Sequence, residues 1–317
     1  MKTNKLKLTV VTPVYNEELV IAHFHARTRE VLNSLVNVNT TILFVVDRCT
    51  DNTLTVLRGI VAEDKNTKII SLSSRFGHQM ALLAGIEYSM DADAIIMMDS
   101  DLQHPPELIP ELLINFRRGF DIVYTVRKDT EDIGFVREMA GNFFYSLLGK
   151  ISQVHINANA SDFRLISRRV ARSLSSDFQE RNMFLRGLFS WMGFQQMGLE
   201  YVAEKRFAGQ SKYSLSQMLQ LAITGILSFS AKPLQMGIFV GVGFAVLAFV
   251  LIVVAVMKYF IVQSIPSGWT TLVVLLLLFS GLQLIVLGIM GAYIGGIYEE
   301  VKGRPRYIIE EVISHHE

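Results

Sequence analysis

The chain has 317 residues, of which 50% are hydrophobic, and its formal net charge at pH 7 is +1. A charge this small argues against nucleic acid as a partner, because nucleic-acid binding requires a strongly basic surface. The single cysteine, Cys49, excludes a disulfide framework and fits a reducing compartment.

The N-terminal residues contain no segment that we expect to be removed. Residues 1–8 include three lysines, but no apolar run of signal-peptide length precedes Pro13 and Asn16. We therefore expect the polar part of the chain to stay in the compartment where it is synthesised.

Short apolar runs alternate with segments of helical periodicity between residues 8 and 125. This alternation predicts an α/β fold, with a mostly parallel sheet and helices on both of its faces. The predicted strands are 8–12, 41–46, 68–72, 94–98 and 121–125, and the predicted helices are 18–35, 53–64, 79–89 and 106–117.

A polar cluster follows each of the first four predicted strands. Ligands bind at the carboxyl ends of the strands in parallel sheets, so these clusters predict a binding crevice along one edge of the sheet. The clusters are 13–17, 47–51, 74–79 and 99–103.

The fourth cluster begins with two carboxylates, Asp99 and Asp101, directly after a buried apolar strand. At spacing i, i+2 their side chains project to the same side and can share one hard cation. Oxygen ligands favour Mg²⁺ or Mn²⁺ over zinc, and such an ion bridges a diphosphate and stabilises the charge of a departing nucleotide. The alternative is a solvated pair of aspartates in a turn.

Two later segments, 137–153 and 214–229, carry apolar residues at i, i+3 and i+4 positions. Such stripes fit helices that lie in the headgroup plane of a membrane. For the first segment, packing against the α/β domain is an equal alternative. The second segment runs directly into an apolar stretch, so we predict an interfacial amphipathic helix at 214–232.

Two apolar stretches without a charged residue, 234–257 and 269–297, exceed the ~20 residues that cross a hydrocarbon core of ~30 Å. Two buried helices of a soluble core are the alternative. Lysine and arginine flank the outer ends of the pair, so the positive-inside rule places both termini in the cytoplasm. We predict transmembrane helices at about 233–258 and 269–297, followed by a cytoplasmic tail at 298–317.

Glycines recur on both apolar stretches. They permit close helix contact, either within the hairpin or between the copies of a homo-oligomer. The segment 304–307, which follows the second stretch, either returns to the α/β domain or contacts lipid phosphate.

The ordered motifs of the chain carry a family resemblance. The motifs are VVTPVYNE at 10–17, Asp47 with Asp51, RFGHQ at 75–79, DSDLQHPPE at 99–107, SDFR at 161–164 and RFAGQSKY at 206–213. With the two apolar stretches, they resemble family 2 glycosyltransferases of the GT-A fold, and among these the polyprenyl-phosphate glycosyltransferases. The bactoprenol (undecaprenyl-phosphate) glucosyltransferases, relatives of the dolichol-phosphate mannose synthases, are the branch that the chain resembles most.

The resemblance implies a reaction. A GT-A domain at 1–213 is expected to transfer a hexose, with inversion, from a UDP-sugar to polyprenyl phosphate, with Mg²⁺ or Mn²⁺ as cofactor. Residues 161–164 resemble the glucosyltransferase branch, so glucose is the expected sugar, and mannose or aminoarabinose is the alternative. A non-catalytic membrane scaffold on the same fold is the alternative of a different class.

The resemblance also implies a location. We expect an integral protein of the bacterial plasma membrane, in contact with lipids, with its catalytic domain in the cytoplasm. The product is expected to serve cell-envelope glycan synthesis or O-antigen modification.

Three sets of residues take roles by resemblance. The nucleotide-sugar site is expected to contain Pro13, Tyr15, Glu17, Asp47, Arg75, Asp99 and Arg127, with Asp47 at the uracil edge. The metal ligands are expected to be Asp99, Asp101 and Gln103. The catalytic set is Asp162, Asp101, Arg206 and Lys212, of which the two cations close over the diphosphate.

Some of these roles have alternatives. Asp162 also fits the N-cap of a helix beginning at Phe163. A lipid phosphate, with a second pKa of ~6, is largely ionised at neutral pH, so Asp162 either accepts a proton or orients a substrate. For Arg206 and Lys212 the alternative is a basic collar against anionic headgroups.

The chain departs from the family pattern at one turn. The family usually has Asp-Gly-Ser where this chain has Asp47, Arg48 and Cys49. Loss of the glycine leaves the turn geometry open, and we expect Arg48 to face water rather than a phosphate. We expect His78 and His104 on the surface or the pocket wall, because no second histidine lies at ligand spacing.

Overall fold

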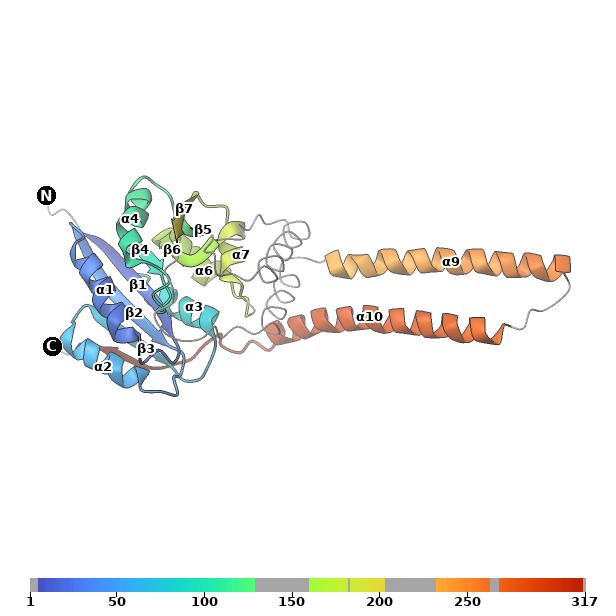
Figure 1. Cartoon of the computed structure of the whole chain (residues 1–317), viewed down its shortest axis with the longest axis horizontal. Coiled ribbons are helices and arrows are strands. Elements are labelled where there is room, and N and C mark those ends of the chain that lie inside the picture. The colour runs from blue at the N-terminus through green and yellow to red at the C-terminus, as the bar shows by residue number, and fades with distance from the viewer. Residues whose placement is uncertain (1–4, 129–159, 182, 203–231, 263–267, 316–317) are drawn as a thin grey trace. The chain divides into compact units, whose positions relative to one another are not determined.

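The computed structural model describes residues 5–128, 160–181, 183–202, 232–262 and 268–315. These residues belong to two compact units: a sheet domain, which includes the chain after Gly303, and a helical unit, which ends at Gly303 (Figure 1). The amphipathic segment 137–153 lies outside the described residues, as does the predicted interfacial helix 214–232 except for Lys232.

The sheet domain confirms each strand and helix predicted between residues 8 and 125, with ends that differ by a few residues. The helix predicted at 106–117 begins as a short 3-10 turn. The elements are β1 (Leu6–Val14), α1 (Ile21–Asn33), β2 (Val38–Val46), α2 (Thr53–Glu63), β3 (Thr67–Leu72), α3 (His78–Tyr88), β4 (Ala94–Met97), η1 (Pro106–Leu108), α4 (Ile109–Arg117), β5 (Ile122–Lys128), β6 (Ala160–Ser167), α6 (Arg168–Asp177), α7 (Leu185–Trp191), β7 (Gln196–Val202) and β8 (Ile309–Ser314).

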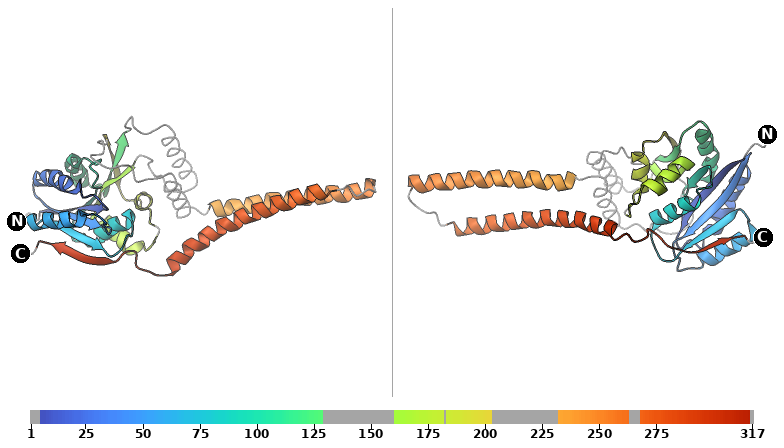
Figure 2. Two further views of the ribbon diagram at one scale, coloured as in Figure 1. Left: turned by 60° about the horizontal axis from the view of Figure 1, so that its bottom comes forward. Right: turned by 180° about the vertical axis from the view of Figure 1, so that it is seen from behind.

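The sheet has the strand order β7-β5-β6-β4-β1-β2-β3-β8. Its centre, β4-β1-β2-β3, is parallel, as the sequence predicts. Strand β6 runs antiparallel to both of its neighbours, β8 runs antiparallel to β3, and β5 pairs in parallel with β7. The α/β class is therefore confirmed, with antiparallel strands on either side of a parallel centre. Helices flank this sheet on both faces (Figure 2).

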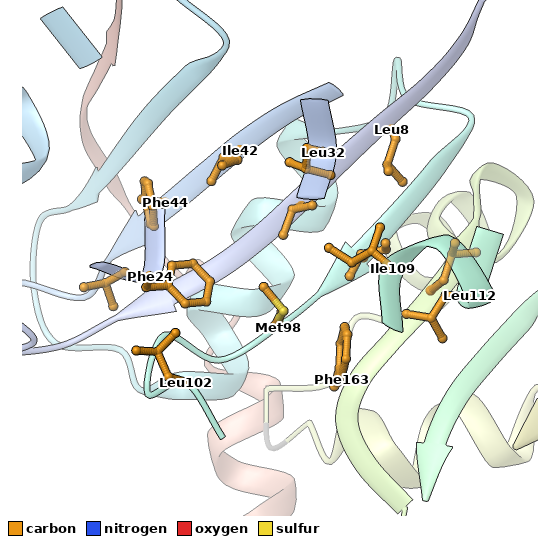
Figure 3. Packing of buried hydrophobic residues seen from close by; sticks show 14 of the residues in the cluster. Leu8, Phe24, Leu32, Ile42, Phe44, Met98, Leu102, Ile109, Leu112 and Phe163 are labelled. Atoms are coloured by element: carbon orange, nitrogen blue, oxygen red, sulfur yellow. The ribbon is translucent and has the colours of Figure 1, made fainter. Parts of the chain in front are cut away.

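The two faces of the central strands pack against different helices. Leu8 and Val10 of β1 belong to a buried cluster with residues of α1, α2 and α4 (Figure 3). Val11, the next residue of β1, points to the other face, where it contacts α3. Strands covered on both faces read as continuous apolar runs, which is why β1 and β2 are easy to recognise in the sequence.

Helix α3 lies close to the sheet at Gly85. A Cβ atom at this position would lie 2.2 Å from Cγ1 of Val11 and 3.0 Å from Cγ2 of Val45, on neighbouring strands. Glycine inside a helix costs about 1 kcal/mol relative to alanine, so the close approach of helix and sheet explains its presence. This contact fixes α3, whose first residue, His78, lies at the candidate site described below.

The end of the chain returns to the sheet domain. Strand β8 pairs with β3 along one edge of the sheet. Just before it, Arg306 Nη2 lies 2.6 Å from Oε1 of Glu87 on α3, and the Tyr307 hydroxyl donates a hydrogen bond to the same carboxylate. Residues 304–317 of the predicted tail at 298–317 therefore belong to the sheet domain. Between the two alternatives for 304–307, the structure has the return to the α/β domain.

The helical unit contains α9 (Lys232–Val262) and α10 (Trp269–Val301). Within α10, a stretch of 28 residues, Val274–Val301, has a mean hydropathy of 2.4, and its most apolar part contains no buried residue. By length and composition this stretch qualifies as a membrane span. The apolar part of α9 is shorter, Gly237–Leu251. The two helices touch each other, with the rings of Phe244 and Phe279 5.5 Å apart.

We expect Gly85→Ala to destabilise the sheet domain, although alanine is the better helix former. The added methyl group overpacks the contact with Val11, which typically costs about 1–3 kcal/mol. The matched control is Gly59→Ala in α2, where no atom lies within 4 Å of the added Cβ. The control is expected to stabilise by up to about 1 kcal/mol. Urea unfolding of the full chain in detergent measures both; effects of the same sign would contradict the prediction.

Candidate active site

The predicted crevice lies where the parallel strands end. The register pairs Val14 of β1 with Val46 of β2, and Val11 with Met97 of β4. The residues that follow these strands, Asp47 and Asp99, are therefore brought to the same edge of the sheet.

Asp47 holds the loop that precedes α3. Its Oδ1 accepts a hydrogen bond from the N–H of Phe76 at 2.7 Å, and its Oδ2 accepts one from Gly77 at 2.9 Å. Its side chain is buried. The guanidinium of Arg75, in the same loop, lies 4.0 Å from the centre of the Tyr15 ring. The structure thus brings together Asp47, Arg75 and Tyr15, three residues of the predicted nucleotide site. Asp47 also stabilises the loop before α3 through its two hydrogen bonds.

The turn after β2 keeps its shape without a glycine. Arg48 takes the left-handed conformation itself, with φ at 46°, at a cost of roughly 1–2 kcal/mol for a side chain other than glycine. Its guanidinium donates a hydrogen bond to the carbonyl of Ser73, and the residue is exposed, so Arg48 faces water as expected. The neighbouring Cys49 Sγ accepts the N–H of Asn16 at 3.2 Å. These contacts join the loops after β1, β2 and β3.

The two carboxylates after β4 lie in a strained loop. Asp101 Oδ1 accepts the N–H of Gln103 at 3.1 Å. Leu102, between Asp101 and Gln103, has a φ of 61°, which is unusual for a leucine. This conformation costs about 1–3 kcal/mol. Its side chain is buried in the cluster beneath the loop (Figure 3). Such strain persists only where the surroundings hold it, and it is commonly found at functional sites.

A divalent cation fits the donor atoms of Asp99 and Asp101. Both side chains are partly exposed, and carboxylate oxygens are the ligands that Mg²⁺ and Mn²⁺ prefer. Among the described residues, no three His, Cys, Asp or Glu side chains are grouped to hold a metal on their own. An ion bound by two carboxylates takes its remaining ligands from substrate phosphate and water. The role of Gln103 as a ligand stays a prediction.

Asp162 lies in strand β6, not at a helix N-cap. The helix that follows begins at Arg168, and Ser167 caps it. Strand β6 is antiparallel to β4, with Met97 opposite Arg164. Continuing this register places Asp162 opposite Asp99. The sheet therefore brings the predicted catalytic carboxylate to the carboxylate loop.

Three basic side chains surround Asp162. Arg186 of α7 contacts both carboxylate oxygens, with Nη2 3.2 Å from Oδ2 and Nε 3.3 Å from Oδ1. Arg164 Nη2 and His78 Nε2 each lie 3.7 Å away. Burial alone would raise the pKa of Asp162, but Arg186, His78 and Arg164 outweigh it and hold that pKa well below its usual value.

His78 links the two carboxylates. Its Nε2 lies 3.7 Å from Oδ1 of Asp99 and 3.7 Å from Oδ2 of Asp162. Burial would lower the pKa of the imidazole, but the two carboxylates raise it to about 9. His78 is thus a partly exposed residue that bridges two charged groups. Arg186 is a functional candidate that sequence reasoning missed. Spacing does not indicate either contact, because His78 and Arg186 both lie far from Asp162 in the sequence.

The other residues predicted for the site lie on β1, on β5, in the loop after β1 or outside the described residues. Arg127 lies near the end of β5, which pairs with β6, the strand of Asp162. Pro13 is the penultimate residue of β1 and lies beside Val45 of β2. The N–H of Glu17 donates to Thr53 Oγ1 at 2.9 Å. Arg206 and Lys212 lie outside the described residues.

The comparisons with known proteins identify a family. Residues 9–175 match the family described as Glycosyl transferase family 2. An uncharacterized glycosyltransferase, YkcC, of Bacillus subtilis is 39% identical over 306 residues, which are 96% of this chain and 94% of that protein.

Two further relatives have more specific names. The SfII prophage-derived bactoprenol glucosyl transferase of Shigella flexneri is 36% identical over 96% of this chain and 98% of its own length. The prophage bactoprenol glucosyl transferase homolog of Escherichia coli K12 is also 36% identical, over 97% of this chain and 99% of its own length.

We expect His78→Gln to flatten the pH dependence of stability in the absence of metal. The pKa of His78 is raised from 6.5 to about 9 in the folded state, so its contribution is fully present below pH 6.5 and is lost as the pH rises through about 9. Urea unfolding in EDTA should therefore show the wild type losing stability across this window, and the variant losing less. Equal losses would show that the carboxylates do not hold a protonated His78.

Proposed function

The chain belongs to glycosyltransferase family 2 and is a glycosyltransferase, and from this premise we propose that it transfers glucose from UDP-glucose to a polyprenyl phosphate. Relatives named bactoprenol glucosyl transferase, which match the chain over nearly its full length, support the lipid acceptor and the sugar. The same reaction with another hexose is the alternative.

One observation carries the proposal: strands β4 and β6 bring the carboxylate loop and Asp162 together. Asp99 and Asp101 would hold Mg²⁺ or Mn²⁺, which neutralises charge on the diphosphate as the nucleotide departs. Tyr15 and Arg75, stacked on one another, are proposed to line the nucleotide site with Pro13, Glu17 and Asp47. Gln103, Arg127, Arg206 and Lys212 keep the roles predicted from the sequence.

The proposed reaction is a single displacement. An oxygen of the acceptor phosphate attacks the anomeric carbon of the sugar on the face opposite the diphosphate. The new C–O bond forms as the bond to the diphosphate oxygen breaks, and the electron pair leaves with UDP, so the configuration inverts. The acceptor phosphate is largely ionised at neutral pH, since its second pKa is ~6. No proton therefore needs to be removed from it.

Asp162 is proposed to orient cations rather than to accept a proton. A carboxylate whose pKa is held well below its usual value by Arg186, His78 and Arg164 is a weak base. Its charge instead keeps Arg186 and His78 in place at the site, where cations stabilise the charge that develops on phosphate oxygens.

The sheet topology supports a membrane hairpin. Strands β7, which ends at Val202, and β8, which begins at Ile309, belong to the same hydrogen-bonded sheet. The chain between them therefore crosses any membrane an even number of times. If Val274–Val301 spans the membrane, a second crossing is required, and α9 is the other long apolar helix among the described residues. With lysine and arginine outside the pair, the sheet domain and both termini are assigned to the cytoplasm.

We also propose an integral location in a bacterial plasma membrane and contact with its lipids. Two further features stay predictions: the interfacial helix at 214–232, and a homo-oligomer formed through the glycines of the two apolar stretches. The non-catalytic scaffold is disfavoured because both carboxylates of the loop and Asp162 are in place at one site.

Transfer of radiolabel to undecaprenyl phosphate in detergent tests the proposal. A panel of UDP- and GDP-sugars is offered with Mg²⁺, Mn²⁺ or EDTA. We expect metal-dependent labelling from UDP-glucose, and a loss of about hundredfold or more in Asp101→Asn, since a catalytic metal contributes several kcal/mol. Asp91→Asn, which alters an exposed carboxylate, is the matched control and should retain activity. If folded protein forms no labelled lipid from any donor, the proposed transfer to a polyprenyl phosphate is wrong.

The pH dependence of kcat distinguishes the two roles of Asp162. We expect Asp162→Asn to lower kcat on the order of hundredfold, through misplaced cations. Because the pKa of Asp162 is held well below its usual value, the ascending limb of the profile should be the same in the wild type and the variant. An ascending limb that is present in the wild type and missing in Asp162→Asn would instead assign it the role of general base.

A further inference from the structure

His104 contacts the carboxylate loop at its beginning. The N–H of Asp99 donates a hydrogen bond to Nδ1 of His104 at 3.2 Å, which closes the loop of residues 99–104 on itself. Leu102, within this loop, has a left-handed backbone and a buried side chain. The loop is thus held at two points, by the apolar anchor of Leu102 and by the ring of His104.

The other side of the His104 ring contacts strand β6. Its Nε2 lies 2.8 Å from Oγ of Ser161, the residue before Asp162. Its ring stacks on Phe163, the residue after Asp162, with ring centres 5.3 Å apart. His104 is buried, so these contacts are made away from solvent.

The hydrogen-bond partners fix the tautomer. Since the backbone N–H of Asp99 can only donate, Nδ1 of His104 is the acceptor and carries no hydrogen. The ring hydrogen of the neutral imidazole therefore lies on Nε2 and is donated to Ser161 Oγ. Each nitrogen thus has one defined partner, and the two partners belong to segments that are far apart in the sequence.

We propose that His104 is a positioning residue that holds Asp99 and Asp101 in register with Asp162. It joins the start of the carboxylate loop to the two residues that flank Asp162. The loop and the strand of Asp162 therefore both contact one buried ring. It does so through Asp99 and Ser161 and is assigned no contact with substrate. This inference rests on the proposed function and names a residue required for its geometry.

The alternative is a histidine that only stabilises the core. Two substitutions separate these possibilities, because each keeps one of the two hydrogen bonds. In His104→Asn the side-chain oxygen can take the place of Nδ1 and keep the bond from Asp99. In His104→Gln the side-chain nitrogen can take the place of Nε2 and keep the bond to Ser161, while the contact with Asp99 is lost.

The test measures binding of UDP in the presence of Mn²⁺ by titration calorimetry, with the full chain in detergent, and separately kcat for lipid glucosylation. We expect His104→Gln to weaken Mn²⁺-dependent UDP binding by about tenfold or more, as is usual when a residue that orients a metal ligand is lost. His104→Asn should bind nearly as the wild type does but have a lower kcat, because Asp99 stays in place while the link to the strand of Asp162 is broken.

The control is His25→Asn in α1, because asparagine reaches only to the position of Nδ1 and loses the contacts of Nε2. His25 Nε2 lies 3.0 Å from Asp64 Oδ2 and 3.1 Å from Thr67 Oγ1, at the amino end of β3 and hence away from the site. This substitution also removes a partly buried histidine from a hydrogen-bond network. It should lower thermal stability without changing Mn²⁺-dependent UDP binding. A purely structural role for His104 would make its variants behave in the same way.

The outcomes are distinct. A folded His104→Gln that binds UDP with Mn²⁺ as tightly as the wild type would overturn the positioning role. If that variant does not fold, Ser161→Ala removes the other end of the link, and an unchanged kcat there would overturn the role. A wild type that shows no Mn²⁺-dependent UDP binding would count against the proposed function itself, and the inference would fail with it.

Discussion

Repulsion between carboxylates is the constraint on which the candidate site depends. Asp99 and Asp162 face the same imidazole, and Asp101 lies two residues from the first. Negative charges this close together are stable only with compensating cations, which His78, Arg164 and Arg186 provide around Asp162. The carboxylates of the loop instead remain partly exposed, as a divalent ion and a diphosphate require. The site therefore has a part around Asp162 whose charge the protein compensates, and a loop whose carboxylates are partly exposed.

Helix α3 connects this site to the rest of the chain. Its first residue, His78, lies between the two carboxylates, and its middle is pressed against the sheet at Gly85. Near its other end Glu87 binds Arg306 and Tyr307, which follow the helical unit in the sequence. The segment that follows α10 is therefore part of the sheet domain and is bound to α3. Burial, followed by the bond to Glu87, raises the pKa of the Tyr307 hydroxyl, so the hydroxyl stays protonated and donates to the Glu87 carboxylate.

Local patterns predicted much of the sheet domain. Strands β1 to β5 and the helices between them were recognisable because buried parallel strands are continuous apolar runs and the helices carry clear periodicity. Strand β8 was missed, since its sequence is short and partly charged and its pairing with β3 is a contact between opposite ends of the chain. The backbone conformation of the turn at Arg48 could not be predicted, for another reason. A non-glycine residue adopts the left-handed conformation only when its surroundings compensate the strain, and the bond to Ser73 is not visible in a sequence.

The sequence by itself determined the candidate residues, which are the pair Asp99 and Asp101 after a buried strand and the motif that contains Asp162. It also determined two long apolar helices, of which α10 is long and apolar enough to cross a membrane. Residue type and short spacing suffice for this, because both are properties of neighbouring residues. Only the tertiary structure decided how these groups meet. The antiparallel register of β4 and β6, continued beyond Met97 and Arg164, places Asp162 opposite Asp99. The contacts of His78, Arg186 and His104 depend on that arrangement. Charge compensation and hydrogen bonding depend on distances of a few ångströms, which only the folded chain fixes.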